Sequence, residues 1–111
     1  MNIENTKAQM RKGILEYCIL GMLKNGDAYA SGIIENLKNA KLIVVEGTLY
    51  PLLTRLKNGG LLAYRWEESP SGPPRKYYKL TPDGEKTLKE LDSTWKDLVE
   101  AVKLTSKTTV Q

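Results

Sequence analysis

The stretch GTLYPLLTRLKNGGLL, Gly47–Leu62, places two different hydrophobic periods side by side and so constrains the fold more than any other part of the chain. Its leucines recur at steps of three and four residues, which predicts a short amphipathic helix with Thr48 as its cap and Pro51 in its first turn. The Gly59–Gly60 pair supplies the left-handed geometry of a helix end. From Leu61 the period drops to two, which predicts a strand. A small helix with a polar outer face therefore leads directly into a β-strand.

A second strand follows across a loop rich in turn residues. The segment ESPSGPP, Glu68–Pro74, is predicted to be a loop that cannot continue a ladder, because proline lacks the backbone donor. RKYYKL, Arg75–Leu80, then reads as a strand, so the two strands form a β-hairpin, or wing, with Arg75 and Lys76 at its tip. Since neighbouring strand residues point to opposite faces, one of the two adjacent tyrosines is expected beneath the sheet and the other facing outward.

The first helix is predicted over Lys7–Lys24 and carries apolar residues on two faces. One face has the spacing of a core stripe, and the other is rich in small residues that let a second backbone approach closely. Two interpretations stay open: both faces serve one broad core, or the helix packs between the core and a partner. The core stripe is Leu15, Cys18, Ile19, Met22 and Leu23, and the second face is Met10, Gly13, Ile14, Tyr17 and Gly21.

A turn at Asn25–Asp27 separates this helix from a second one, which is predicted over Ala30–Asn39. The β-branched residues within Lys41–Gly47 disfavour helix and predict an extended connection to the short third helix. A helix, a turn and another helix thus precede the stretch described first.

The last helix has a well-marked start, with Thr81 as its cap and Pro82 at the first helical position. Its large apolar residues are spaced by three and four, which is the heptad seam of a helix that packs against another long helix. A fully exposed seam is not expected, since each large apolar side chain removed from water contributes roughly 1.5 to 3 kcal/mol. The alternative to packing against a partner is that the helix folds back on its own domain. The seam consists of Leu88, Leu91, Trp95, Leu98 and Val102.

Size and composition exclude several classes of protein. The 111 residues fit one ordinary domain, and no run is apolar enough to span a bilayer or to serve as a secretory signal, so a cytoplasmic protein without membrane contact is expected. The chain has no histidine, no glycine-rich phosphate loop and no nucleophile elbow, so no enzyme, metal or cofactor is expected. Cys18 lies in an apolar run and is expected to be a buried structural thiol.

Three helices followed by a hairpin make the winged helix-turn-helix arrangement, a fold that is mainly α with a small β-hairpin. Residues 1–81 are predicted to form this domain, residues 82–104 a long C-terminal dimerisation helix, and residues 105–111 a flexible tail. In such modules the third helix enters the DNA major groove and the wing lies along the adjacent backbone.

The distribution of charge favours DNA as the partner. Residues 1–81 hold 12 Lys and Arg against 7 Asp and Glu. A DNA-binding regulator is therefore predicted, and the alternative is a winged-helix protein–protein adaptor that dimerises through the last helix and does not bind DNA. Positive charge on the third helix and wing favours the first. The predicted DNA-binding residues are Thr48, Tyr50, Pro51, Thr54 and Arg55 of the helix and Gly72, Arg75, Lys76 and Tyr77 of the wing.

The paired motifs EGTLYPLLTRLKNGGLL and SGPPRKYYKLTPDG resemble the signature of the PadR family of bacterial transcriptional regulators, and the resemblance covers Lys7 to about Val102. The single C-terminal helix is similar to the compact branch of that family. This resemblance implies a homodimeric repressor of a palindromic operator, in which the last helix crosses the first helix of the other subunit. The implied dimer interface is Met10, Ile14, Tyr17, Leu88, Leu91, Trp95, Leu98, Val99 and Val102.

The resemblance also implies a small aromatic effector. In some compact relatives two tryptophans, one from each subunit, face each other across the dimer centre and hold flat aromatic drugs, and Trp95 lies at the matching place. The alternative stays open that Trp95 is core or interface, and Tyr17 is large enough to fill the space that a ligand would use. The implied effector-binding residues are Met10, Gly13, Ile14, Tyr17, Trp95 and Val99.

Overall fold

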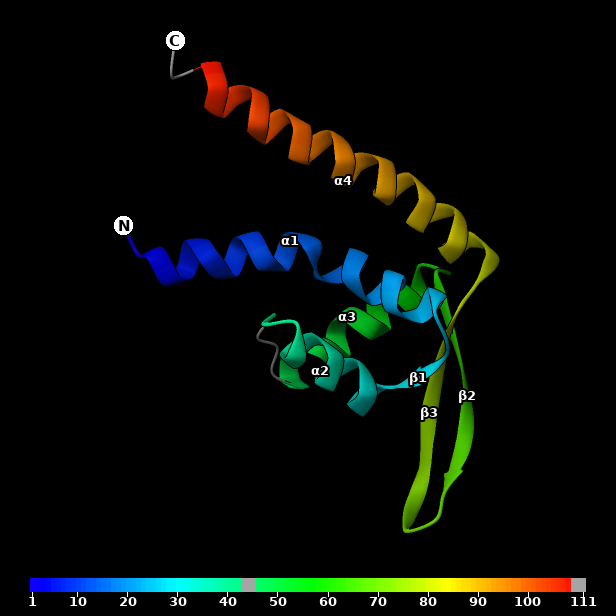
Figure 1. Cartoon of the computed structure of the whole chain (residues 1–111). Helices are drawn as coiled ribbons and strands as arrows, with labels where there is room; N and C mark the ends of the chain where they lie inside the picture. Colours follow the sequence, from blue (N-terminus) through cyan, green and yellow to red (C-terminus); the bar gives the residue numbers. More distant parts are fainter. Residues whose placement is uncertain (43–45, 109–111) are drawn as a thin grey trace.

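The computed structural model describes residues 1–42 and 46–108, which form four helices and one three-stranded antiparallel sheet (Figure 1). The predicted fold class, mainly helical with a small sheet after the third helix, is confirmed. The elements in chain order are α1 (Ile3–Lys24), β1 (Ala28–Tyr29), α2 (Ala30–Asn39), α3 (Glu46–Asn58), β2 (Leu62–Ser69), β3 (Gly72–Leu80) and α4 (Pro82–Thr108).

The core lies where α1, α2 and α3 meet the base of the hairpin. Leu20 of α1 is buried although it lies outside the predicted stripe, whereas Cys18 and Met22 of that stripe are only half-buried. Partial burial raises the pKa of the Cys18 thiol, which keeps it protonated. The buried apolar residues are Leu15, Ile19, Leu20, Leu23, Ile33, Ile34, Leu37, Leu49, Leu53, Leu56, Leu62, Tyr78 and Leu88.

Two helices begin earlier than the sequence predicts. The α1 helix starts at Ile3 rather than Lys7, because the Asn2 side chain accepts a hydrogen bond from the Asn5 amide at 3.2 Å and caps it. The α3 helix starts at Glu46 rather than after Thr48.

Because α3 starts earlier, two predictions are wrong: the position of Pro51 within the helix and the end of the extended connection before it. Pro51 lies past the first turn, where its missing N–H removes one intrahelical hydrogen bond. The last two residues of the predicted extended connection, 46 and 47, belong to the helix. Residues 43–45 of that connection lie outside the described residues.

The sheet has the strand order β1-β3-β2, and β1 was not predicted. Its two residues, Ala28 and Tyr29, pair with Tyr78 and Tyr77 of β3. Two residues are too short to show a period of two, so only the pairing with β3 identifies this strand. The pairing attaches the wing to the connection between α1 and α2.

The hairpin is longer than predicted. The prediction of a loop over Glu68–Pro74 is wrong, because β2 continues to Ser69 and β3 begins at Gly72. The strands pair up to Ser69 and Gly72, and the register shifts between Glu67 and Ser69, where the prolines of β3 are accommodated. Prolines are tolerated at such irregularities, which require fewer backbone donors. Arg75 and Lys76 therefore lie within β3, opposite Glu67 and Trp66, and not at the tip.

Thr81 joins three elements at the base of the hairpin. Its hydroxyl accepts a hydrogen bond from the Gly84 amide at 3.0 Å, as predicted for the cap of α4, and donates one to the Gly60 carbonyl at 2.6 Å. Its own amide donates to the Leu61 carbonyl at 3.1 Å. The end of α3 and the start of α4 are therefore held by one residue.

The α4 helix packs against α1 near the sheet, and the two helices diverge toward their free ends (Figure 1). It continues to Thr108, so the predicted helix end at residue 104 is too early. Thr105, a residue of the predicted tail, lies inside the helix, and its hydroxyl donates to the Ala101 carbonyl at 2.9 Å. Residues 109–111 of that tail lie outside the described residues. No helix in the described part of the chain has the length and apolar composition that a bilayer crossing requires.

We predict that Gly84→Ala destabilises the fold. A Cβ atom at this position would lie 2.2 Å from the Leu61 carbonyl oxygen and 2.7 Å from Leu80 Cδ1, so backbone must shift to accommodate it. A loss of about 1 to 3 kcal/mol is expected from such overpacking, measured by urea unfolding. Gly32→Ala is the matched control, because a Cβ there meets no atom within 4 Å. An equal response of the two variants would contradict the close packing at the start of α4.

Candidate nucleic-acid interface

The outer face of α3 is polar and exposed because its inner face is fixed by leucines. Leu49 and Leu53 have no exposed surface, and Leu56 is 2% exposed. On the opposite side Tyr50 is 48% exposed, and Thr54, one turn further along, is also exposed. Thr48 and Pro51 are likewise exposed. The outer face thus offers hydroxyl groups and an aromatic ring to a partner.

Arg55 lies on the flank of α3. Arg55 lies five positions after Tyr50, which places the two about 140° apart around the helix axis. Its Nη1 atom lies 3.0 Å from Glu16 Oε1 of α1, while the side chain remains 75% exposed. Sequence periodicity alone does not show this pairing, because Glu16 lies on another helix.

A hollow of about 340 Å³ lies between α3, the start of α2 and the wing. It brings together Tyr50 and Thr54 of α3 with Arg75 and Lys76 of β3, four of the predicted DNA-binding residues. Thr48, Pro51, Arg55, Gly72 and Tyr77 do not line it. The rest of the lining consists of residues outside the predicted DNA-binding set: Tyr29, Ala30, Ser31, Trp66, Pro74 and Tyr78.

The wing face beside α3 combines aromatic rings with a cation. Lys76 Nζ lies 4.5 Å from the ring centroid of Tyr64 and 5.6 Å from that of Trp66. Trp66 is 62% exposed, which is unusual for so large an apolar side chain. The period of two in the sequence predicts a strand here but does not show which of its side chains stay exposed. An exposed tryptophan beside a lysine suits contact with nucleic acid.

The two adjacent tyrosines of β3 take opposite faces, as predicted. Tyr78 is the one beneath the sheet, 5% exposed, and burial raises the pKa of its phenol. Tyr77 lies half-buried on the other face, with its ring centroid 4.6 Å from that of Tyr29. Tyr77 therefore faces away from the hollow.

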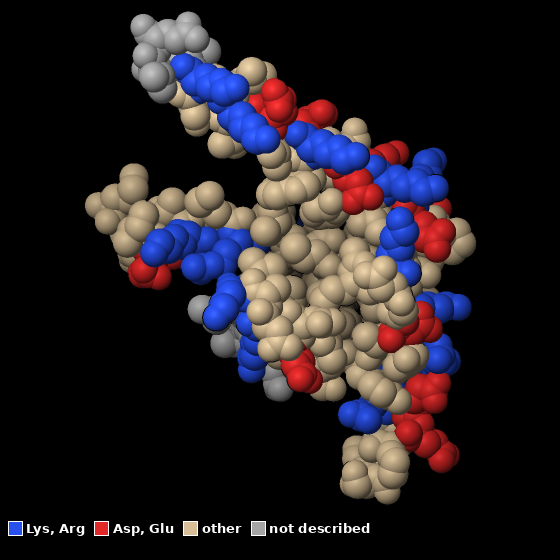
Figure 2. Space-filling model, viewed as in Figure 1, with Lys and Arg blue, Asp and Glu red and all other residues tan. Residues whose placement is uncertain are grey.

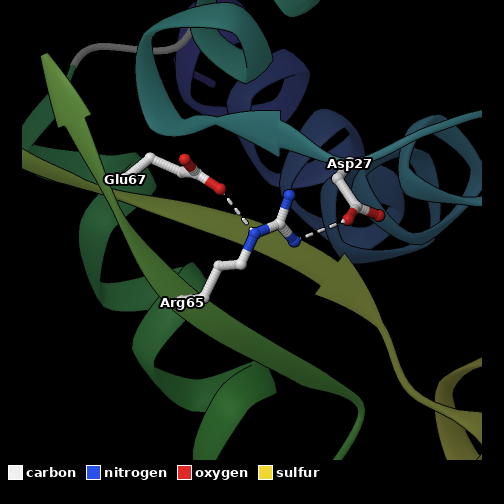
Figure 3. A network of polar contacts seen from close by, with 3 residues as sticks. All are labelled: Asp27, Arg65 and Glu67. Carbon is white, nitrogen blue, oxygen red and sulfur yellow. Dashed lines mark hydrogen bonds and ion pairs between the residues drawn. The ribbon is translucent and has the colours of Figure 1, made fainter.

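On that other face Arg65 joins two carboxylates (Figure 3). Its Nε atom donates to Glu67 Oε1 at 2.6 Å, and its Nη1 atom donates to Asp27 Oδ2 at 3.1 Å. The hydrogen bond to Glu67, followed by that to Asp27, raises the pKa of the guanidinium above its ordinary value. The network links β2 to the connection between α1 and β1.

A second surface lies between α1 and α4. An apolar hollow of about 420 Å³ is lined by Met10 of α1 and by Trp95, Leu98, Val99, Val102 and Lys103 of α4. Trp95 is 42% exposed and Val102 is 64% exposed. Of the remaining seam residues, Leu88 is buried and Leu91 half-buried in the chain's own core. The seam therefore divides into a half that packs within the chain and a half that stays open.

Tyr17 joins the two helices at the inner end of this surface. Its hydroxyl donates to Asp92 Oδ1 at 2.6 Å, and its ring centroid lies 6.4 Å from that of Trp95. The hydrogen bond to Asp92 is the largest cause that raises the pKa of Tyr17. Gly13, Ile14 and Tyr17 do not line the apolar hollow, so the structure brings only Met10, Trp95 and Val99 of the implied effector set to it.

Charge is unevenly placed around the open surface. Figure 2 shows charged atoms along the visible face of α4 and on the lower side of α1, while most of the atoms seen between the two helices are uncharged. An apolar face that is bordered by charge in this way is typical of an interaction surface.

Comparison with known proteins places these features in a family. Residues 19–90 match the model of the transcriptional regulator PadR-like family. A PadR-like transcription factor from Bacteroides fragilis is similar at 66% identity and a TM-score of 0.76, over 88% of this chain and 95% of that one. A PadR family transcriptional regulator from Eggerthella lenta is similar at 33% identity and a TM-score of 0.82, over 90% and 88%. An uncharacterised protein from Lysinibacillus sphaericus is 29% identical over 88% of this chain and 93% of its own length.

We predict that Tyr17 ionises above the ordinary tyrosine pKa of about 10 and that Asp92→Asn lowers its pKa. Because the folded-state pKa is raised, the stabilisation from this hydrogen bond is complete below pH about 10 and is lost as the pH rises through the folded-state value. Ultraviolet titration of phenolate absorbance measures the shift, and Tyr17→Phe identifies the signal. An unchanged titration curve in Asp92→Asn would contradict the contact.

Proposed function

The chain belongs to the PadR-like family of transcriptional regulators, and on this basis we propose that it is a homodimeric repressor that binds a palindromic operator. One observation supports DNA contact most strongly: hydroxyl groups of α3 and cations of β3 line the same hollow. Hydroxyl groups suit base edges and phosphate oxygens, and cations suit phosphate, so the hollow matches the chemistry of a DNA backbone beside a groove. A cytoplasmic location follows for a protein that acts on bacterial DNA.

In the proposed complex the outer face of α3 enters the major groove and the wing follows the neighbouring backbone. Thr48, Tyr50 and Thr54 supply hydrogen bonds to bases or phosphates. Arg75 and Lys76 neutralise phosphates. Pro51 and Gly72 lie at the edges of the contact, whereas Tyr77 faces the other side of the sheet and takes no part in it.

Arg55 has a different place in this proposal. It reaches a phosphate on the far flank of α3 while it remains paired with Glu16, because three-quarters of its side chain stays exposed in that pair. A guanidinium has five donors, so one carboxylate does not use up its capacity.

A second copy of the chain is the proposed occupant of the apolar surface between α1 and α4. Leaving Trp95, Leu98 and Val102 in water is unfavourable, and the same surface on a second chain is self-complementary about a twofold axis. A twofold dimer presents two α3 helices, which is why the operator should be palindromic.

The proposed effector is a flat aromatic compound that binds between the Trp95 rings of the two subunits. Met10 and Val99 add apolar contacts in the same hollow. A ligand that fits one spacing of the subunits better than another changes the distance between the two recognition helices, and the repressor is released from its operator. The alternative, an adaptor without DNA binding, is separated from this proposal by the first test below.

We predict specific binding to the DNA upstream of the protein's own gene, with affinity that falls steeply as salt rises. Arg75→Ala should weaken binding to all sequences about equally and reduce the slope of log K against log salt by about 1, because one phosphate contact is lost. Fluorescence anisotropy at two salt concentrations, with unrelated DNA for comparison, measures both effects.

Lys89→Ala on α4 is the control for net charge in this experiment, since Lys89 is exposed and lies outside the hollow. It should leave the affinity unchanged. Absence of any preference for the upstream DNA, together with no salt dependence, would favour the adaptor.

We predict that Trp66→Phe protein, in which Trp95 is the sole tryptophan, is a dimer whose fluorescence is quenched by planar aromatic cations. Adding Leu98→Glu should produce a monomer and abolish the quenching, because a carboxylate is introduced into the apolar hollow. Sedimentation and fluorescence titration measure the two results. A monomeric Trp66→Phe protein would contradict the dimer, and a dimer without quenching would contradict the effector alone.

A further inference from the structure

Glu67 and Arg75 lie directly opposite each other on β2 and β3 but do not form an ion pair. Side chains at opposite positions of an antiparallel pair have Cβ atoms about 4.5 to 5.5 Å apart, and opposite charges there attract. Glu67 instead accepts a hydrogen bond from Arg65 Nε at 2.6 Å. The Arg75 guanidinium carbon lies 4.2 Å from the ring centroid of Tyr29. In place of the expected cross-strand ion pair, Glu67 is hydrogen-bonded to Arg65 and Arg75 contacts the Tyr29 ring.

Arg65 is held in place from several directions, as Figure 3 shows for its two carboxylate partners. Asp27 accepts from its Nη1 atom at 3.1 Å, which draws the guanidinium toward the connection before β1. The guanidinium carbon also lies 4.5 Å from the ring centroid of Tyr77. A guanidinium that is bonded at two edges and stacked on a ring loses little further freedom when it holds Glu67.

Arg75 is left free for another anion as a result. Its side chain makes neither an ion pair nor a hydrogen bond with any other residue in the described ranges 1–42 and 46–108. The contact of its guanidinium with the face of the Tyr29 ring leaves the in-plane N–H donors available. A planar guanidinium with free donors, supported on an aromatic ring, is suited to bidentate recognition of a phosphate.

We propose that Arg65 is a positioning residue for DNA binding, which holds the Glu67 carboxylate away from Arg75 so that Arg75 keeps its donors for a DNA phosphate. Arg65 itself does not line the hollow between α3 and the wing. The inference rests on the proposed DNA-binding function. It gives Arg65, on the wing face that is turned away from the hollow, an indirect role in the phosphate contact of Arg75.

The test compares Arg65→Gln with two double variants of equal net charge. Arg65→Gln releases Glu67 to pair with Arg75, so DNA affinity should fall about threefold to fivefold and the salt slope should fall by about 1, as in Arg75→Ala. Arg65→Gln with Glu67→Gln should recover the affinity and slope, because no carboxylate then competes for Arg75. Arg65→Gln with Asp27→Asn should not recover them, because Glu67 remains charged.

Lys79→Gln is the control for the loss of one positive charge, since Lys79 is an exposed residue of the same strand. Thermal unfolding of each variant checks that the wing remains folded. Equal recovery of DNA affinity in both double variants would show that only net charge matters. Recovery in neither double variant would show that Arg65 has a purely structural role. Each of these results overturns the inference. A wild-type protein without salt-dependent DNA binding would instead contradict the proposed function.

Discussion

Burial of the α3 leucines is the constraint on which the candidate DNA-binding surface depends. Leu49, Leu53 and Leu56 are almost completely removed from water in the core formed with α1 and α2. Each such side chain stabilises the fold by roughly 1.5 to 3 kcal/mol, so α3 cannot rotate about its axis without a large loss of free energy. That fixed rotation directs Tyr50 and Thr54 toward the wing and leaves Arg55 at the flank beside Glu16.

The junction at Thr81 connects this surface to α4. The Thr81 hydroxyl caps α4 and donates to the carbonyl of Gly60, just after the end of α3. The Thr81 amide donates to the Leu61 carbonyl at the start of the hairpin. Gly84 lets the first turn of α4 approach the Leu61 carbonyl more closely than any other residue would allow. These contacts, together with the packing of Leu88 and Leu91 on the core, connect α4 to the rest of the chain.

Local signals made the helical part of the chain predictable from sequence. The bounds of α2 and the cap of α4 are as predicted because periodicity, a break and a capping threonine act over neighbouring residues. Pairing across the chain was not predictable in the same way. The strand at Ala28–Tyr29 and the ion pair between Arg55 and Glu16 each depend on a partner far away in sequence. The extension of the hairpin to Ser69 and Gly72 depends on a shift of register that accommodates residues usually found in turns. The sequence predicted four polar residues that line the hollow, from their chemical type and their position on α3 and the wing. The exposure of Trp66 and the hydrogen bonds of Arg65 became visible only in the structure.

The most direct test of the central claim is hydroxyl-radical footprinting of the protein on the DNA upstream of its own gene. The claim is that α3 and the wing form one DNA surface and that a twofold dimer presents it twice. Two protected patches on one face of the duplex, related by the palindrome and centred about 10 base pairs or a multiple of that apart, are the predicted result. A single protected patch, or protection that does not follow the symmetry of the sequence, would contradict the account.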